Sequence, residues 1–190
     1  MSQFSFDFGD PEPKRRNRLF FTLFPDKETA LKSQKIGREI KSLAGIKSRM
    51  LPIERRHMSL NHVGDFTRLK SKTIFAATQA AKSVTAAPVT VTLDRLMTFN
   101  GRPANHPCVL YGEASNALAA FHQSLALAML RCGLRAGLDF TPHMTLLYCP
   151  ENIPSREIEP ISFVAKEFFL VHSLLRRTQY NVVGSWRLCG

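Results

Sequence analysis

Long apolar runs are missing from this chain of 190 residues. No window approaches the 18 or more apolar residues of a transmembrane helix, so we expect no membrane span and no membrane partner. Residues 1–17 are polar and charged and lack the apolar segment of a secretory signal, so they are predicted to form a flexible leader. Together these absences favour a cytoplasmic protein.

Cysteine is also scarce, with four residues that lie far apart in the chain: Cys108, Cys132, Cys149 and Cys189. None forms a C-x-x-C pair or lies at zinc-finger spacing from a histidine, so nothing suggests a structural metal. Without an export signal, the thiols are expected to be reduced. We therefore predict no metal and no cofactor.

Acidic residues are outnumbered, because 26 Lys and Arg face 15 Asp and Glu, for a formal net charge of +11. Such an excess of positive charge concentrates polyanions near a protein, although it specifies no fold. It favours nucleic acid, nucleotide or phosphoester partners, with a merely basic surface as the alternative.

Both halves of the chain show the same order of patterns. Hydrophobic periodicity, with Asp26 as a helix N-cap and Gly45 as a helix end, defines the elements. In the first half we predict a strand at 18–24, a helix at 28–43, a strand holding His57, a helix at 67–84 and a strand at 88–99. In the second half we predict a strand at 106–112, a helix at 116–134, a strand holding His143, a loop at 151–159 and one strand at 161–175.

The spacings support an internal duplication. Leu19 precedes His57 by 38 residues, and Cys108 precedes His143 by 35. A repeat of this length must pair with its twin to bury its sheet face. We therefore predict an α+β protein with one bilobal domain over residues 18–190, built from interleaved half-repeats of about 18–99 and 100–190 and related by a pseudo-two-fold axis. A monomer is the default expectation.

The strongest motif is a histidine two residues before a hydroxyl, written once in each half as "HMSL" and "HMTL". Strand side chains alternate between faces, so His57, Ser59 and Asn61 are predicted to share one face. The opposite face then takes Met58, Leu60 and His62. In the second copy, His143 and Thr145 share a face in the same way. Under a pseudo-two-fold axis, the two pairs would confront each other across a cleft.

Two facing imidazoles with two hydroxyls suit phosphoester chemistry. Histidine has an ordinary pKa of about 6.5, so one ring can be neutral while its neighbour is protonated. The neutral ring can accept a proton from water or a hydroxyl, and the charged ring can donate one to the leaving alkoxide. The hydroxyls of Ser59 and Thr145 can donate to phosphoryl oxygens. This chemistry requires no metal.

With "RLFFTLFPD" and "VHSLLRRTQYNVVGSWRL" beside the doubled motif, the chain resembles the two-histidine (2H) phosphoesterase superfamily over about residues 18–190. Within it, the chain looks most like the RNA 2′,3′-cyclic phosphodiesterase and 2′-5′ RNA ligase family. The resemblance implies two antiparallel sheets that face a central groove, with helices outside. It also implies metal-free opening of a 2′,3′-cyclic phosphate at an RNA or nucleotide end to a 2′-phosphomonoester, and in some members reversible 2′-5′ ligation.

Carried over residue by residue, the resemblance makes His57 and His143 the catalytic histidines and Ser59 and Thr145 the phosphate-binding hydroxyls. The sequence leaves open which ring is the acid, with a slight preference for His143 as the base and His57 as the acid. Tyr148 stands where many relatives carry an arginine.

Further candidates for substrate contacts are less specific. Arg55 is one strand step from His57 and could supply the missing charge, Phe20 or Phe21 could stack on a base, and Ser173 could reach the groove. Arg176 and Arg177 suit either phosphate contacts or plain surface charge. Two alternative functions remain: an RNA-binding module with degenerate catalysis, and a 2H phosphodiesterase for another 2′-5′-linked or cyclic nucleotide.

Overall fold

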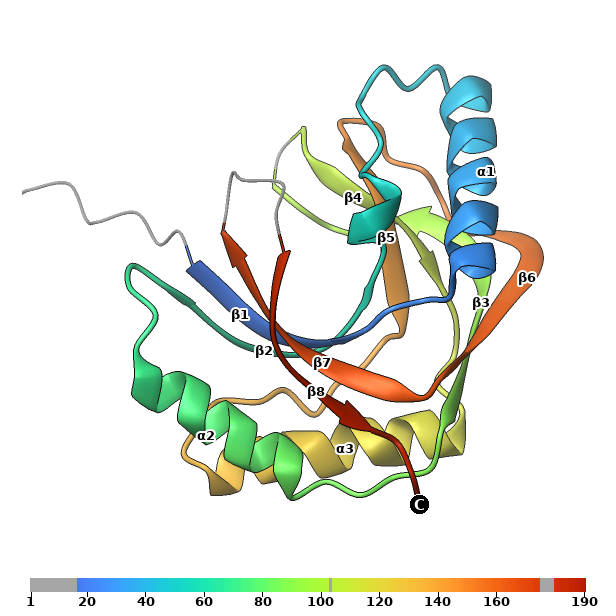
Figure 1. The fold of residues 1–190 in the computed structure, drawn as a ribbon. Coiled ribbons are helices and arrows are strands. Elements are labelled where there is room, and N and C mark those ends of the chain that lie inside the picture. The colour runs from blue at the N-terminus through green and yellow to red at the C-terminus, as the bar shows by residue number, and fades with distance from the viewer. Residues whose placement is uncertain (1–16, 103, 175–179) are drawn as a thin grey trace, which may run out of the picture.

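A computed structural model describes residues 17–102, 104–174 and 180–190 of the chain (Figure 1). The predicted leader up to residue 16, and Arg176 and Arg177, lie outside the described residues. The described part contains eight strands, three α-helices and one short 3-10 helix. In chain order they are β1 (Asn17–Leu23), α1 (Lys27–Leu43), the 3-10 helix η1 (Ile53–Arg55), β2 (Met58–Phe66), α2 (Ser71–Lys82), β3 (Val89–Thr98), β4 (His106–Tyr111), α3 (Asn116–Arg131), β5 (His143–Cys149), β6 (Arg156–Ala165), β7 (Glu167–Leu174) and β8 (Tyr180–Arg187).

All paired strands are antiparallel and follow the order β6-β3-β4-β5-β2-β1-β7-β8. In the middle of this order, β2 and β5 are joined by a single described residue pair, Met58 with Met144. The prediction of an α+β fold is confirmed. The resemblance implied two sheets. The structure instead joins the eight described strands in one sheet, because β2 and β5 are neighbours and connect its two halves.

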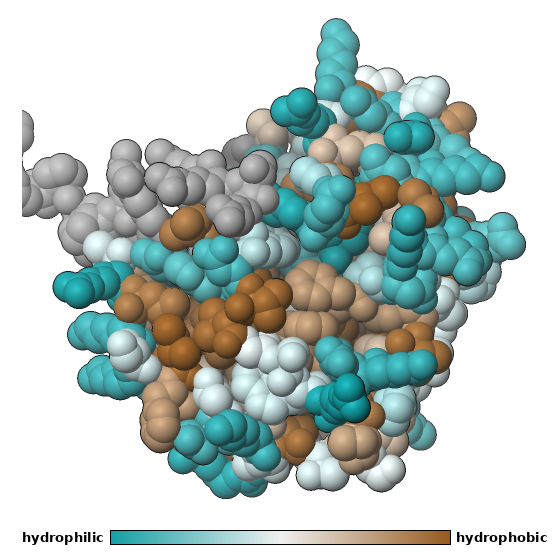
Figure 2. All heavy atoms as spheres, in the orientation of Figure 1, coloured by the Kyte–Doolittle hydropathy of each residue, from teal (hydrophilic) through white to brown (hydrophobic). Residues whose placement is uncertain are grey.

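The helices lie where the sequence places them, with shorter ends. Asp26 caps α1 by accepting a hydrogen bond from the Thr29 amide at 2.7 Å, and Gly45 follows the helix with a φ of +63°. α1 packs against β5 and β6, and its outer side is hydrophilic (Figures 1 and 2). α2 and α3 pack together on the other side, against β2, β3 and β8.

The core forms from apolar residues that alternate along the strands. In β1, the side chains of Leu19, Phe21 and Leu23 are fully buried. Phe21 contacts Phe168 and Trp186, which come from β7 and β8. Burial of each such side chain contributes about 1.5–3 kcal/mol, so β1 is held firmly at the centre of its half of the sheet.

The predicted strand at 161–175 is wrong as a single element. It is two strands, because the chain turns at Lys166: β6 pairs with β3, and β7 pairs with β1. Both strands bury alternate residues, so the apolar pattern runs through the turn without a break. The predicted loop at 151–159 is also shorter than expected, since β6 already begins at Arg156. The mostly exposed strand β8 has too little alternation to be seen in the sequence.

Strict alternation also fails in β2. Thr22 pairs with Ser59 but Phe20 pairs with His62, so three steps along β2 match two steps along β1. This extra residue is a β-bulge, which shifts the faces of the side chains beyond it. Asn61 therefore turns to the helix side, against the prediction, and lies 3.1 Å from Nε2 of His122. His62 turns the opposite way, to the side of His57, where the sequence did not put it.

Candidate active site

The two His-x-hydroxyl motifs meet at the Met58–Met144 pair. Both methionine side chains are fully buried, so the residues on either side of them point to the opposite face. In an antiparallel pair, the residue before one member lies opposite the residue after the other. His57 is therefore brought opposite Thr145. By the same rule, Ser59 is brought opposite His143, and the four groups alternate around one small area.

Each imidazole is held by the same local hydrogen bond. Nδ1 of His57 lies 2.8 Å from the carbonyl oxygen of Arg55, and Nδ1 of His143 lies 2.8 Å from that of Thr141. A carbonyl oxygen can only accept, so Nδ1 carries the proton in both rings. The Nε2 atom of each neutral ring is then left with a lone pair, ready to accept a proton. His143 is the first residue of β5, as expected for a histidine in a strand, whereas His57 lies one residue before β2 begins.

The surroundings of His57 favour its neutral form. Its ring lies 5.3 Å from the ring of Phe20 and 5.4 Å from that of Tyr180, measured between centroids. Burial lowers the pKa of His57 to about 4, and electrostatic repulsion from the nearby His143, Arg55 and Arg56 adds to this effect, while the hydrogen bond to the Arg55 carbonyl opposes it. Near neutral pH, His57 is therefore uncharged.

One cleft of about 480 Å³ collects the predicted residues. Eight of the side chains singled out from the sequence line it: Phe20, Arg55, His57, Ser59, His143, Thr145, Tyr148 and Ser173. Four further lining residues were not assigned to it: Arg18, Leu51, His62 and Tyr180. The described lining includes no carboxylate, so the cleft is suited to an anion. The catalytic and binding roles of these residues stay predictions.

Arg55 and Tyr180 form a pair beside His57. The guanidinium carbon of Arg55 lies 4.6 Å from the centroid of the Tyr180 ring, and its Nη2 donates to the Tyr180 hydroxyl at 3.3 Å. The Nε atom of Arg55 is buried without a hydrogen-bond partner among the described atoms. Burial raises the pKa of the Tyr180 hydroxyl, so it stays protonated at neutral pH. The pair thus brings positive charge and a hydroxyl to the cleft.

Phe20 lies mainly among the aromatic rings beside His57. Its side chain is only 5% exposed, and its ring packs against His57 and Tyr180. Little of the ring is left for a base to stack on. Phe21, the other candidate for stacking, is fully buried in the core. A base-stacking role for Phe20 stays a prediction, whereas support of the His57 ring follows from its contacts.

Arg18, His62 and Asp65 form a second charged group at the cleft. Arg18 binds Asp65 with both ends of its fork, Nε to Oδ1 at 2.7 Å and Nη2 to Oδ2 at 2.8 Å. Nε2 of His62 lies 3.1 Å from the same Oδ1. The hydrogen bond from Arg18 is the main reason that the pKa of Asp65 falls to about 2, with a smaller contribution from His62. Asp65 therefore orients two cleft side chains at once.

Sequence reasoning missed these residues for identifiable reasons. Arg18 begins the strand pattern that contains Phe20, and alternation places the two on one face, which is the signal that was available. His62 was assigned to the wrong face of β2 because of the bulge, and no residue type in β2 indicates that bulge. Tyr180 lies in the closing segment that supports the family resemblance, but its weakly patterned strand gave no face assignment.

Other features of the described residues do not compete with this cleft. A hollow of about 430 Å³ between α1 and β6 is lined by three cations and three carboxylates, without histidine. In residues 17–102, 104–174 and 180–190, no three or more His, Cys, Asp or Glu side chains group as metal ligands would. No described helix is long and apolar enough to cross a membrane.

Comparison with known proteins identifies the family. The model of the 2′-5′ RNA ligase superfamily matches residues 9–174, which is most of the chain. The chain belongs to the 2′-5′ RNA ligase superfamily. The recognition of a 2H phosphoesterase from the doubled histidine motif is thereby confirmed. A search among curated proteins gave no significant match.

Several solved structures share the fold. Apo LigT of E. coli is 21% identical, with a TM-score of 0.70, and the match covers 93% of this chain and 100% of LigT. LigT has also been solved with 3′-AMP, at the same identity and coverage and a TM-score of 0.67. The protein TT0787 of Thermus thermophilus is 20% identical, with a TM-score of 0.67 and coverage of 90% and 97%. At these identities, the likeness describes the architecture.

Proposed function

We propose that this superfamily member is a metal-independent RNA 2′,3′-cyclic phosphodiesterase that produces 2′-phosphomonoester ends. The observation that carries the proposal is the arrangement of two imidazoles around the Met58–Met144 pair. Each imidazole has a fixed Nδ1 proton and a free Nε2, and each lies opposite a hydroxyl. Two proton-transfer groups and two donors around one point are what an in-line displacement at phosphorus needs.

In the proposed reaction, water attacks the phosphorus of the cyclic phosphate opposite O3′. One imidazole accepts the proton of the attacking water at Nε2, and the other donates its Nε2 proton to O3′ as the P–O3′ bond breaks. The products are a 2′-phosphomonoester and a free 3′-hydroxyl. Ser59 and Thr145 donate hydrogen bonds to the non-bridging oxygens, which carry the charge in the transition state.

The low pKa of His57 favours this ring as the proton acceptor. Because burial holds it neutral above about pH 4, it is in the basic form when substrate arrives. We therefore propose His57 as the base and His143 as the acid, which reverses the slight preference drawn from the sequence. After hydrolysis His57 is protonated and His143 is neutral. Proton exchange with solvent then restores the starting state of each ring.

Charge around the cleft supports a substrate with phosphate groups. Arg18 and Arg55 both line it, and Arg55 has a buried Nε without a described partner. We propose that Arg55 provides the cationic contact that relatives obtain from an arginine at the position of Tyr148. Tyr148 is exposed at the cleft and can donate a hydroxyl instead. Ser173, buried at the cleft wall next to Arg18 in the β1–β7 register, is a further proposed contact.

Relatives support the ligand class. E. coli LigT has been solved in complex with 3′-AMP, NADP+, ATP and phosphate. We propose that this chain binds nucleotides or RNA ends in the cleft lined by His57 and His143, and that 2′-5′ ligation is the same displacement with the 5′-hydroxyl of a second RNA in place of water. In that case one imidazole accepts the proton of the 5′-hydroxyl as the P–O5′ bond forms, and the other donates a proton to O3′ as the P–O3′ bond breaks, so the histidines keep their roles.

The test is incubation of the purified protein with an oligonucleotide that ends in a 2′,3′-cyclic phosphate, in the presence of EDTA. Formation of the 2′-monophosphate is the expected result, and chromatography against 2′- and 3′-phosphate standards identifies it. Failure to form product at every pH between 5 and 8 would contradict the proposal. Salt-dependent RNA binding without product would instead favour a binding module.

A further inference from the structure

Arg56 is the most deeply buried charged side chain of the described residues, with 1% exposure. Its Nη1 donates to the carbonyl oxygens of Thr145 at 2.8 Å and Leu146 at 2.9 Å. Its Nη2 donates to Oε1 of Gln34, on α1, at 2.7 Å. No carboxylate of the described residues forms an ion pair with it. A buried cation without an anion is costly, so its presence calls for a specific use.

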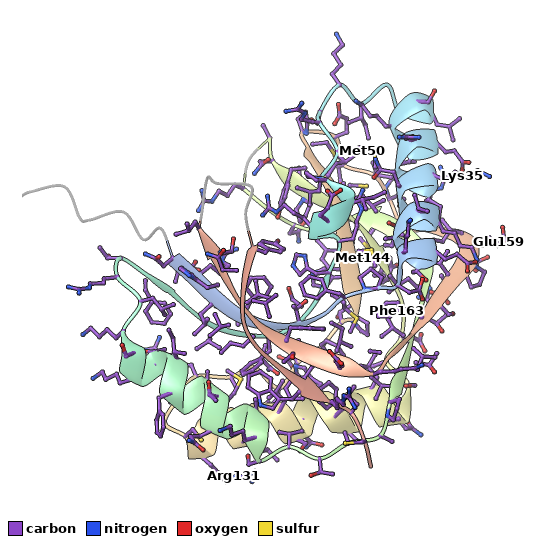
Figure 3. All side chains as sticks on the ribbon, viewed as in Figure 1. Lys35, Met50, Arg131, Met144, Glu159 and Phe163 are labelled. Atoms are coloured by element: carbon purple, nitrogen blue, oxygen red, sulfur yellow. The ribbon has the colours of Figure 1, made fainter. Side chains whose placement is uncertain are left out.

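This side chain lies where the backbone ladder of the sheet is weakest. β1 and β2 share six residue pairs and β4 and β5 share six, but β2 and β5 share only the Met58–Met144 pair. Figure 3 labels Met144 near the centre of the molecule and Met50 above it, on the segment that follows α1. Beyond this single pair, the carbonyls on this side of β5 need other donors.

Arg56 supplies those donors across the seam. It leaves the chain two residues before Met58 and reaches past Met144 to the carbonyls of Thr145 and Leu146. The backbone amide of Leu51 also donates to the Leu146 carbonyl, at 2.9 Å. The side chain thus continues the contact between the two histidine strands after their backbones separate.

The neighbours of Arg56 in sequence and in space belong to the candidate active site. His57 follows it directly, in extended backbone, so the two side chains point to opposite sides of the chain. Nη1 of Arg56 donates a hydrogen bond to the carbonyl oxygen of Thr145, the residue that lies opposite His57. One guanidinium therefore connects the backbone of the first motif to that of the second, from behind the cleft.

We infer that Arg56 is a positioning residue, which fixes His57 relative to Thr145 and His143 by hydrogen bonding across the seam. The inference rests on the proposed function, because it assigns Arg56 to the geometry of the same reaction. A planar fork is needed: two donors reach adjacent β5 carbonyls and a third reaches Gln34, which the single ammonium of lysine cannot reproduce in the same geometry. Displacements of about 1 Å at a reacting centre can cost about 100-fold in rate.

The test compares Arg56→Lys and Arg56→Met with Arg49→Met, a change at an exposed arginine outside the cleft lining. We expect both Arg56 variants to lower kcat by about 10- to 100-fold while KM for a 2′,3′-cyclic nucleotide stays within about threefold. Arg49→Met should match the unmodified protein. Thermal unfolding reports the folded fraction, and if Arg56→Met does not fold, Arg56→Lys carries the test because it keeps the charge.

A second readout does not depend on turnover. Histidine ring signals are followed by NMR while inorganic phosphate is added, with assignments from His57→Gln and His143→Gln. In the unmodified protein, both rings should respond with one affinity, because they bracket one anion. In Arg56→Lys, the response of His57 should weaken by several-fold while that of His143 persists.

The outcomes separate the two proposals. If both Arg56 variants keep kcat and both ring responses within about twofold, the positioning role is wrong while the proposed function stands. If the unmodified protein turns over no cyclic phosphate, the proposed function is wrong, and the ring responses still decide the role of Arg56. If neither ring of the unmodified protein responds to phosphate, there is no shared anion and the positioning role is overturned.

Discussion

Met58 and Met144 are paired across the junction of β2 and β5, and this one pair sets the arrangement of the whole candidate site. Both side chains are fully buried, so their chain neighbours must face the cleft. The antiparallel pairing then places each histidine beside the hydroxyl of the other motif. The two copies of the motif are therefore more than a sequence repeat, because one backbone pair brings both copies into the same candidate site.

Replacement of either histidine tests the chemistry most directly. His57→Ala and His143→Ala should each lower kcat for a 2′,3′-cyclic-phosphate RNA end by at least about 10²–10⁴-fold, the usual contribution of a general acid or base. Steady-state kinetics with far-ultraviolet circular dichroism checks both activity and fold. His106→Gln, outside the cleft lining, is the matched control and should keep full activity. Unchanged turnover in either cleft variant would remove that ring from the mechanism.

At positions 59 and 145, kcat should depend on the presence of a hydroxyl group and little on whether serine or threonine carries it. Thr145→Val keeps the shape of the side chain but loses the donor, and Ser59→Ala loses the donor at the other motif. We expect each to lower kcat by about 10–100-fold, since a lost donor to developing charge costs about as much or more in other enzymes. Thr145→Ser and Ser59→Thr should stay within a few-fold. If Thr145→Val matched Thr145→Ser, hydrogen bonding by this residue would be unimportant.

Stability should depend on pH through His57. Its pKa is about 4 in the folded protein and near 6.5 when unfolded, so between these values the unfolded chain binds more protons. The stabilisation is complete above about pH 6.5 and is lost as the pH falls toward 4. From pH 7.5 to 4.5 we expect a loss on the order of 2 kcal/mol from this group, measured by urea unfolding. His57→Gln should lack this component, and an identical pH dependence in that variant would contradict the assignment.

The rate should report the same group. If neutral His57 is the base, kcat/KM should rise with pH through about 4 and reach a plateau governed by other groups, because kcat/KM reflects the free enzyme. If His57 were instead the acid, kcat/KM would fall as the pH rises above about 4. A pH–rate profile from 3.5 to 8 therefore separates the two assignments of acid and base.

The sequence predicted those parts of the molecule that depend on local patterns. Asp26, Gly45 and the apolar periodicity defined the helices, and the repeated motif located the site, because all of these are written in neighbouring residues. Eight of the candidate residues line one cleft, which is where the doubled motif placed its four members. The proposed duplication itself stays a prediction.

What the sequence did not predict depends on contacts between distant segments. The bulge in β2 is visible only in its pairing register with β1, which lies elsewhere in the chain. The turn at Lys166 is hidden because the buried alternation continues on both sides of it. The sequence does not distinguish Arg56 from the other cations, since only the fold brings its guanidinium to the carbonyl oxygens of Thr145 and Leu146.

The Arg18–Asp65 pair offers a test of how the cleft attracts its substrate. Both side chains are partly exposed, so the pair should contribute only about 0–1 kcal/mol to stability, and Arg18→Gln should fold normally. If Arg18 contacts a phosphate of the RNA, this variant should weaken binding of a single-stranded RNA end. The slope of log K against log salt should also become shallower by about 0.7, the value for one phosphate contact on a single strand.

Asp65→Asn separates contact from orientation in the same experiment. This change leaves the charge of Arg18 in place but weakens the fork that holds it and the hydrogen bond to His62. We expect the slope of log K against log salt to stay close to that of the unmodified protein while KM rises several-fold. The Arg18 cation is still present in this variant, but Asp65 no longer orients it well. Fluorescence anisotropy over 50–300 mM salt, with KM measured in parallel, gives both values. Equal slopes for Arg18→Gln and the unmodified protein would show that Arg18 supports Asp65 and His62 and does not touch the RNA.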